Sequence, residues 1–92
     1  MKNEKRKLIN QLKKLKVNDR VEVEWLDHFT EPGWQRGEYI NKQELLLCKS
    51  AGYFVGANKE SMKIGASVDP YSKYNDVTHI ICSCIKSVRK LK

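Results

Sequence analysis

The spacing of apolar side chains changes once along the chain, near residue 20. In residues 3–16 the apolar positions recur at i, i+4 and i+7, a period that predicts a helix with one apolar stripe under a basic opposite face. The stripe consists of Leu8, Ile9, Leu12 and Leu15. From Val21 onward, apolar and polar residues alternate, which is typical of half-buried strands. The chain is therefore expected to be mainly β, with one helix at its start.

Turn-forming residues divide the rest of the chain into short strands. The predicted elements are a strand at 21–26, a long surface loop at 27–37, a strand at 45–55, a hairpin of 51–57 with 61–68, a loop at 69–76, a strand at 77–82, and a 3₁₀ turn that leads into a short last strand. Gly52 interrupts an apolar run, so the backbone is expected to bend there or to approach a neighbour closely.

Five short strands, a long loop after the first and a one-turn helix before the last match the layout of a small SH3-like barrel. We predict two parts, a basic amphipathic helix at 1–17 and an SH3-like barrel at 18–92. A chain of 92 residues makes one domain, which buries only about 60–65 % of the surface of its unfolded chain. So small a domain has no space for the deep pocket of most metabolic enzymes, and we expect a protein without enzymatic activity.

The net charge of +7 is concentrated at the two ends of the chain. Residues 1–20 hold eight basic and two acidic side chains, and residues 86–92 hold four basic and no acidic ones, whereas residues 21–85 hold six basic and nine acidic ones. A polyanion such as nucleic acid is therefore expected to bind the ends rather than the body. The cations predicted to bind it are Lys5, Arg6, Lys7, Lys13, Lys14, Lys16, Arg89 and Lys90. The alternative for the helix is structural: its stripe packs on the body or on a partner subunit, and its lysines are solvated.

The composition also bears on location and on cofactors. The charged start lacks the apolar core of about 7–15 residues that a secretory signal requires, and no apolar run approaches the ~20 residues of a membrane span. The three cysteines, Cys48, Cys82 and Cys84, are an odd number without regular disulfide spacing, which suits reduced thiols in the cytoplasm. His79 with these cysteines lacks the paired spacing that zinc favours, so neither a metal nor another cofactor is predicted.

Aromatic residues near two loops are candidates for a ligand-binding face. Trp34 follows Gly33 and precedes Arg36 by two positions, so the indole can stack on a base while the guanidinium binds a phosphate. The alternative for Trp34 is a lid folded over the core. The other candidates are Tyr53, Tyr71, Tyr74, Trp25, Asp27 and His28. Trp25 is in phase with the core residues and Tyr53 lies on a strand, so packing is the alternative for both.

Asp27 and His28 also raise the question of acid–base catalysis. Neighbours on a strand point to opposite faces, so the two side chains are not predicted to act as a pair. Asp27 is instead expected to cap the loop by accepting backbone N–H groups, or to accept a hydrogen bond from a ligand.

Several short motifs follow one another in residues 17–92. They are Val21-x-Val23-x-Trp25-x-Asp27, Gly33-Trp34, Ser50-x-Gly52-Tyr53-x-Val55, and Ile81 followed by Ile85, Val88 and Leu91. In this order and spacing the chain resembles a group of small uncharacterised proteins encoded by bacteriophages, which usually look like SH3-type barrels. The chain departs from the group at Cys82, where a proline commonly follows the isoleucine, so a less rigid entry to the last turn is expected.

The resemblance implies a binding role and carries no established activity. Phage accessory proteins of this size inhibit host proteins or sequester the nucleotide messengers of antiphage immunity. The first hypothesis is therefore a phage-type, anti-defence protein in the host cytoplasm that sequesters an anionic, nucleotide-type ligand. A small barrel offers only a shallow pocket, so this hypothesis includes a homo-oligomer with sites between subunits. The alternatives are nucleic-acid binding by the lysine-rich ends and inhibition of a host protein; no membrane partner is expected.

Overall fold

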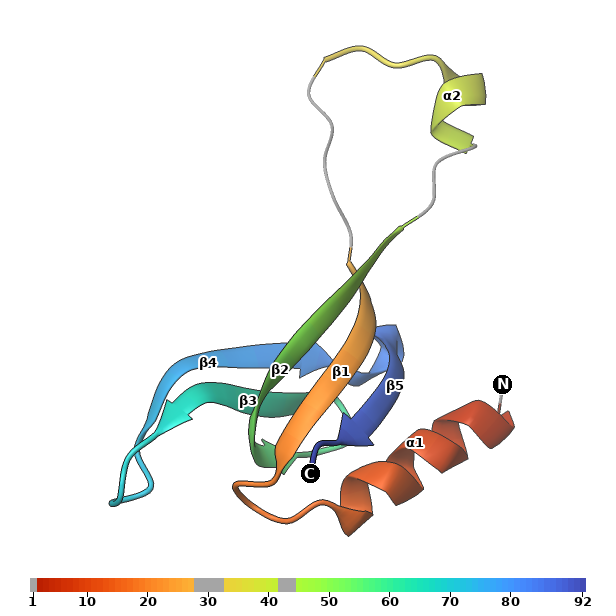
Figure 1. Cartoon of the computed structure of the whole chain (residues 1–92). Coiled ribbons are helices and arrows are strands. Elements are labelled where there is room, and N and C mark those ends of the chain that lie inside the picture. The colour runs from red at the N-terminus through yellow and green to blue at the C-terminus, as the bar shows by residue number, and fades with distance from the viewer. Residues whose placement is uncertain (1, 28–32, 42–44) are drawn as a thin grey trace.

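A computed structural model of the chain describes residues 2–27, 33–41 and 45–92 (Figure 1). In chain order the elements are α1 (Lys2–Lys14), β1 (Arg20–Asp27), α2 (Gly37–Asn41), β2 (Leu46–Ala57), β3 (Ser61–Val68), β4 (Tyr74–Ile81), a 3₁₀ turn η1 (Cys82–Cys84) and β5 (Ile85–Lys90). The predicted mainly β class, with a helix at the N-terminus and a 3₁₀ turn before the last strand, is confirmed.

The five strands form one antiparallel sheet in the order β4-β3-β2-β1-β5. The sheet is open, with β4 and β5 at its two edges. β1 lies between β2 and β5, so that Val23 is opposite Ser50 on one side and Val88 on the other. β2 and β3 form the predicted hairpin, and the Asn58 side chain closes its turn by accepting the backbone N–H groups of Glu60 and Ser61.

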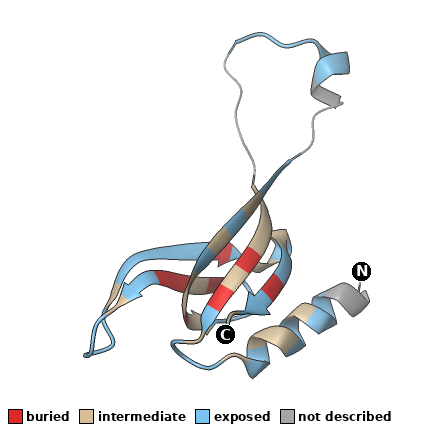
Figure 2. Ribbon diagram, in the orientation of Figure 1, coloured by how far each residue is buried: buried red, intermediate tan, exposed pale blue. Residues whose placement is uncertain are grey.

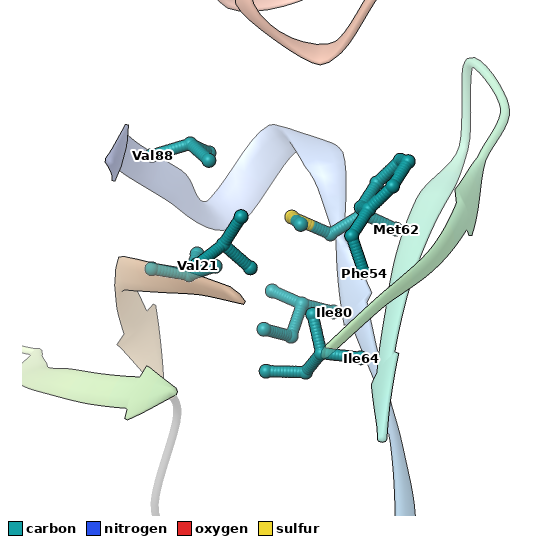
Figure 3. Close-up of a cluster of buried hydrophobic side chains, with 7 residues drawn as sticks. Val21, Phe54, Met62, Ile64, Ile80 and Val88 are labelled. Carbon is teal, nitrogen blue, oxygen red and sulfur yellow. The ribbon is translucent and has the colours of Figure 1, made fainter. Parts of the chain in front are cut away.

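The core is a cluster of seven buried apolar side chains to which all five strands contribute (Figure 3). They are Val21, Val23, Phe54, Met62, Ile64, Ile80 and Val88. Alternation along each strand explains their spacing, because side chains two positions apart point to the same face. The buried segments of the strands lie close together in the lower half of the molecule, where the sheet curls (Figure 2). Each fully buried side chain of this kind contributes about 1.5–3 kcal/mol.

Helix α1 packs its apolar stripe against this cluster. Leu8, Leu12 and Leu15 are partly buried there, whereas Ile9 at the flank of the stripe is 38 % exposed. The structural interpretation of the helix, packing on the body, is therefore the observed one. The link from α1 to β1 is fixed by Asp19, whose carboxylate accepts the backbone N–H of Lys16 and whose carbonyl accepts that of Phe54.

Of the two alternatives predicted at Gly52, the close approach to a neighbour is confirmed, because Gly52 lies close to the backbone of Gly65. The pairing of β2 with β3 is irregular between Phe54 and Gly56. Two other details of the chain differ from the sequence prediction. The second loop is shorter than predicted, because β4 begins at Tyr74. The short helix α2, within the connection between β1 and β2, was not predicted.

The close approach at Gly52 gives a testable prediction. A Cβ at this position would lie 2.7 Å from the carbonyl oxygen of Gly65, a backbone atom that cannot rotate away, so Gly52→Ala is expected to lower the free energy of unfolding by about 1–3 kcal/mol. Gly56, on the same strand, has no atom within 4 Å of such a Cβ, and Gly56→Ala is expected to change stability by less than about 1 kcal/mol. Urea denaturation of both variants measures the difference; equal losses would contradict the contact.

Candidate functional site

The aromatic residues predicted to bind a ligand do not all meet in one site. Trp34 is fully exposed and Arg36 is exposed, both in the connection between β1 and β2, while Tyr71 is 85 % exposed in the turn between β3 and β4. The connection that carries α2 and the β3–β4 turn lie at different ends of the molecule (Figure 1). Because Trp34 is fully exposed, the lid alternative for it is wrong.

The remaining aromatic candidates have structural contacts. Trp25 packs against the core and donates its indole N–H to the Ser50 hydroxyl at 3.0 Å. Tyr53 is half-buried in β2, between its neighbours on β1 and β3. The Tyr74 hydroxyl donates to the Asn18 side-chain oxygen at 2.6 Å, so it joins the start of β4 to the turn before β1.

The predicted pair at the end of the first strand is only partly described. Asp27 is half-buried as the last residue of β1, opposite Leu46 of β2. His28 lies outside the described residues, so its predicted role in ligand binding stays a prediction.

The two basic ends of the chain, by contrast, come together in space. Helix α1 contacts β5, and both chain ends lie on this side of the molecule (Figure 1). The Arg20 guanidinium donates to the carbonyl oxygen of Lys92 at 2.6 Å, which holds the C-terminal residue beside the start of β1. We use the name α1–β5 face for nine exposed cations that are carried by α1, by the link after it and by β5: Lys5, Arg6, Lys7, Lys13, Lys14, Lys16, Lys86, Arg89 and Lys90. This face is the strongest candidate functional surface of the described chain.

Two cations of the α1–β5 face have acidic neighbours. Arg89 lies 3.2 Å from a Glu22 carboxylate oxygen, and Lys90 lies 3.6 Å from a carboxylate oxygen of Asp19. Among the described residues, the exposed cations of α1 and Lys86 have no such ion pair. These unpaired cations are therefore available to an external anion. Lys86 was not among the predicted binding residues, although it belongs to the basic segment 86–92 that the sequence indicated.

A shallow groove of about 380 Å³ lies between α1 and the β2–β3 turn. Its lining is mainly apolar, with two lysines, and comprises Ile9, Leu12, Lys13, Phe54, Ala57, Asn58 and Lys59. Sequence reasoning missed this groove. The i, i+4 spacing of Ile9 and Lys13 places them on one helix face, but nothing local indicates that the β2–β3 turn lies opposite.

The three cysteines are free thiols. Burial raises the pKa of the Cys82 thiol above its ordinary value of 9.0, and the nearby Lys63 charge lowers it by less, so the thiol is protonated at neutral pH. Across residues 2–27, 33–41 and 45–92, no three side chains of His, Cys, Asp or Glu are grouped so as to hold a metal ion. His79 is exposed on β4, opposite Lys63.

Comparisons with known proteins do not identify the chain. No protein-family model, curated protein or solved structure matches it. Neither helix of the described residues has the length and apolar character needed to cross a bilayer. The resemblance to small phage proteins stays a prediction.

A substitution at Tyr74 tests whether its hydroxyl group has a structural role. Tyr74→Phe removes the hydrogen bond to Asn18 and is expected to lower the free energy of unfolding by about 0.5–1.5 kcal/mol. Tyr71→Phe, whose exposed hydroxyl has no described partner, is expected to leave stability unchanged within about 0.5 kcal/mol. Chemical denaturation compares the two variants; unchanged stability in Tyr74→Phe would refute the structural role.

Proposed function

We propose that this protein binds nucleic acid without catalysing a reaction, and that the α1–β5 face is its binding surface. The observation that carries the proposal is that cations from the two ends of the sequence lie on adjoining elements, α1 and β5. Neutralising phosphates with exposed lysine and arginine releases counterions from the nucleic acid, which supplies sequence-independent affinity.

The charge of the rest of the chain supports the same surface. Residues 21–85 hold nine acidic and six basic side chains, so they repel a polyanion on balance. A bound duplex is therefore held against the basic end and kept away from the acidic body. The proposed contacts are between charged side chains and phosphates, which carry no sequence information, so the binding is expected to show little sequence preference.

We also propose that the sheet is an SH3-like arrangement. The strand order β4-β3-β2-β1-β5, the long connection after β1 and the 3₁₀ turn directly before β5 support this proposal, although the described sheet is open. A phage origin and a place in the host cytoplasm belong to the same proposal and rest on the sequence motifs alone. An SH3-like sheet offers an exposed surface rather than a deep cavity, which suits a binding protein.

Nucleic-acid binding predicts a strong dependence on salt. Wild-type affinity for short duplex DNA of unrelated sequences should fall steeply between about 50 and 200 mM salt, and Lys7→Gln or Lys14→Gln should each reduce the salt slope by roughly 1. Lys73→Gln removes the same charge from an exposed position in the β3–β4 turn and should leave the slope unchanged. Fluorescence anisotropy titrations at several salt concentrations measure the slopes. Absent or salt-insensitive binding, or equal effects of all three variants, would refute the proposal.

Sequestration of an anionic, nucleotide-type ligand is the second candidate, and the groove beside α1 is the observation that favours it. Its volume of about 380 Å³ lies within the range of roughly 300–1,000 Å³ that is usual for small-molecule sites. The apolar lining from Ile9, Leu12 and Ala57 suits a flat base, and Lys13 with Lys59 suits a phosphate. In this candidate function the ligand binds in the groove rather than at the loop aromatics, which lie apart from one another.

A thermal-shift measurement tests this second candidate. A nucleotide held at about 100 times its dissociation constant should stabilise the protein by roughly 2.7 kcal/mol, which corresponds to several degrees in so small a domain. Lys59→Glu should abolish the shift, whereas Lys73→Glu, which makes the same change in the β3–β4 turn, should retain it. A shift that survives Lys59→Glu but is lost in Trp34→Ala would place the ligand at the β1–β2 connection and refute the groove.

A further inference from the structure

The hairpin of β1 and β2 extends beyond the rest of the sheet. β5 pairs with β1 only from Val21 to Trp25, and β3 pairs with β2 only from Tyr53 to Ala57. Past these limits, Leu26 and Asp27 are paired only with Leu47 and Leu46. The result is a two-stranded ribbon that projects from the sheet (Figure 1). We call this ribbon, together with the described residues 33–41 and 45 of the connection, the arm.

The arm carries half of the exposed large apolar side chains of the described chain. Those on the arm are Trp34, Tyr39, Leu45, Leu46 and Leu47, and those elsewhere are Ile9, Val17, Tyr71, Val77 and Ile81. The three consecutive leucines are each more than 50 % exposed, although successive residues of a strand point to opposite faces. A two-stranded ribbon is marginally stable in water, and an exposed apolar cluster marks an interaction surface. Both observations indicate that a partner covers the arm.

We propose that the partner is a second copy of this chain, which packs its arm against the first arm about a two-fold axis. The register places two cross-strand pairs on one face of the β1–β2 hairpin, Leu26 opposite Leu47 in the arm and Glu24 opposite Lys49 at its base. Within one copy, Glu24 and Lys49 form no ion pair among the described residues. A face with an apolar pair beside one acidic and one basic group is self-complementary under a two-fold axis, because Glu24 of each copy meets Lys49 of the other.

The distribution of charge favours contact through the arm. Each copy has a net charge of +7, so two copies repel one another wherever their basic ends approach. In the sequence, residues 26–47 hold four acidic and two basic side chains, a net charge of −2. The α1–β5 face lies at the other end of a molecule whose longest extent is 51 Å. Charges separated by more than about 8–10 Å are largely screened at physiological salt. Contact through the arm leaves the basic faces out of the interface between the two copies.

Dimerisation in the absence of nucleic acid tests this inference, independently of the proposed function. Wild-type protein should show a concentration-dependent dimer by sedimentation equilibrium at concentrations up to on the order of 100 µM, the range of a weak to moderate interface. Leu47→Lys should weaken the dimer roughly 30-fold or more, because it places an ammonium group at the centre of the contact. Ile81→Lys makes the same change at an equally exposed strand position, 60 % against 57 %, and should leave the dimer intact. A monomeric wild type, a dimer that survives Leu47→Lys, or equal losses in both variants would overturn the proposal.

A charge exchange keeps the test decisive if Leu47→Lys fails to fold. Glu24→Lys and Lys49→Glu should each weaken self-association, because each variant brings like charges together across the axis. Mixing the two variants should restore association as a heterodimer, since the new lysine of the first variant then meets the new glutamate of the second. With one variant uniformly labelled with ¹⁵N, native mass spectrometry separates the heterodimer from either homodimer by mass. A mixture without an excess of heterodimer would overturn the two-fold arm contact, even if the wild type is a dimer.

Discussion

The fold depends on how an open sheet keeps water away from a core that comprises seven buried side chains among the described residues. The strands alone leave the cluster uncovered on one side, and Leu8, Leu12 and Leu15 of α1 pack there. Taken as half-buried, these three leucines contribute roughly 2–4 kcal/mol, against a usual total of about 5–15 kcal/mol for a small domain. The helix is therefore part of the structural unit rather than an appendage, although the sequence divides it from the strands by a change of period.

Because α1 closes the core with one face, its other face is held in a fixed position relative to β5. This arrangement turns two separate basic segments of the sequence into one candidate surface, the α1–β5 face. It also means that stability and binding share an element. A chain without residues 1–16 would lose the leucine contacts together with the cations, so a loss of binding would not identify its cause. Single lysine substitutions remove charge while leaving the apolar stripe in place.

Local signals in the sequence were sufficient for most elements. The helix, the β2–β3 hairpin and the 3₁₀ turn depend on spacing and turn residues within a few positions, and all three are present. Tyr74 was assigned to a loop because turn-forming residues surround it, but pairing with Val68 draws it into β4. Its hydroxyl partner, Asn18, is 56 positions away in the sequence. Whether the sheet closes into a barrel is equally hard to predict from local sequence, because closure depends on whether the two edge strands, β4 and β5, meet.

The candidate surfaces were predictable to different degrees for the same reason. The cations at the two ends are evident from composition, but their proximity requires the packing of α1 beside β5. The loop aromatics looked like one site because Trp34, Tyr71 and Tyr74 all lie near turn-forming residues, a feature that says nothing about distance. The exposure of Leu46 and Leu47 was hidden for another reason. Both belong to an apolar run that is typical of a buried strand, but among the described residues neither β5 nor β3 pairs with the ribbon there, and both side chains are exposed.

The arm, with half of the exposed large apolar side chains of the described chain, lies at the opposite end of the molecule from the basic face, and this separation relates the two proposed surfaces. In the arm-to-arm dimer the basic faces take no part in the contact, so each can contact nucleic acid without obstructing the apolar contact. Bound phosphates neutralise lysines that otherwise contribute to repulsion between copies, so polyanion binding does not oppose dimerisation. When one basic face of the dimer is bound to a polyanion, the other face is held nearby at a high effective concentration. The dimer is therefore expected to bind a long polyanion, which can reach both faces, more strongly than a short one. Weak individual contacts are thereby sufficient for a protein of this size.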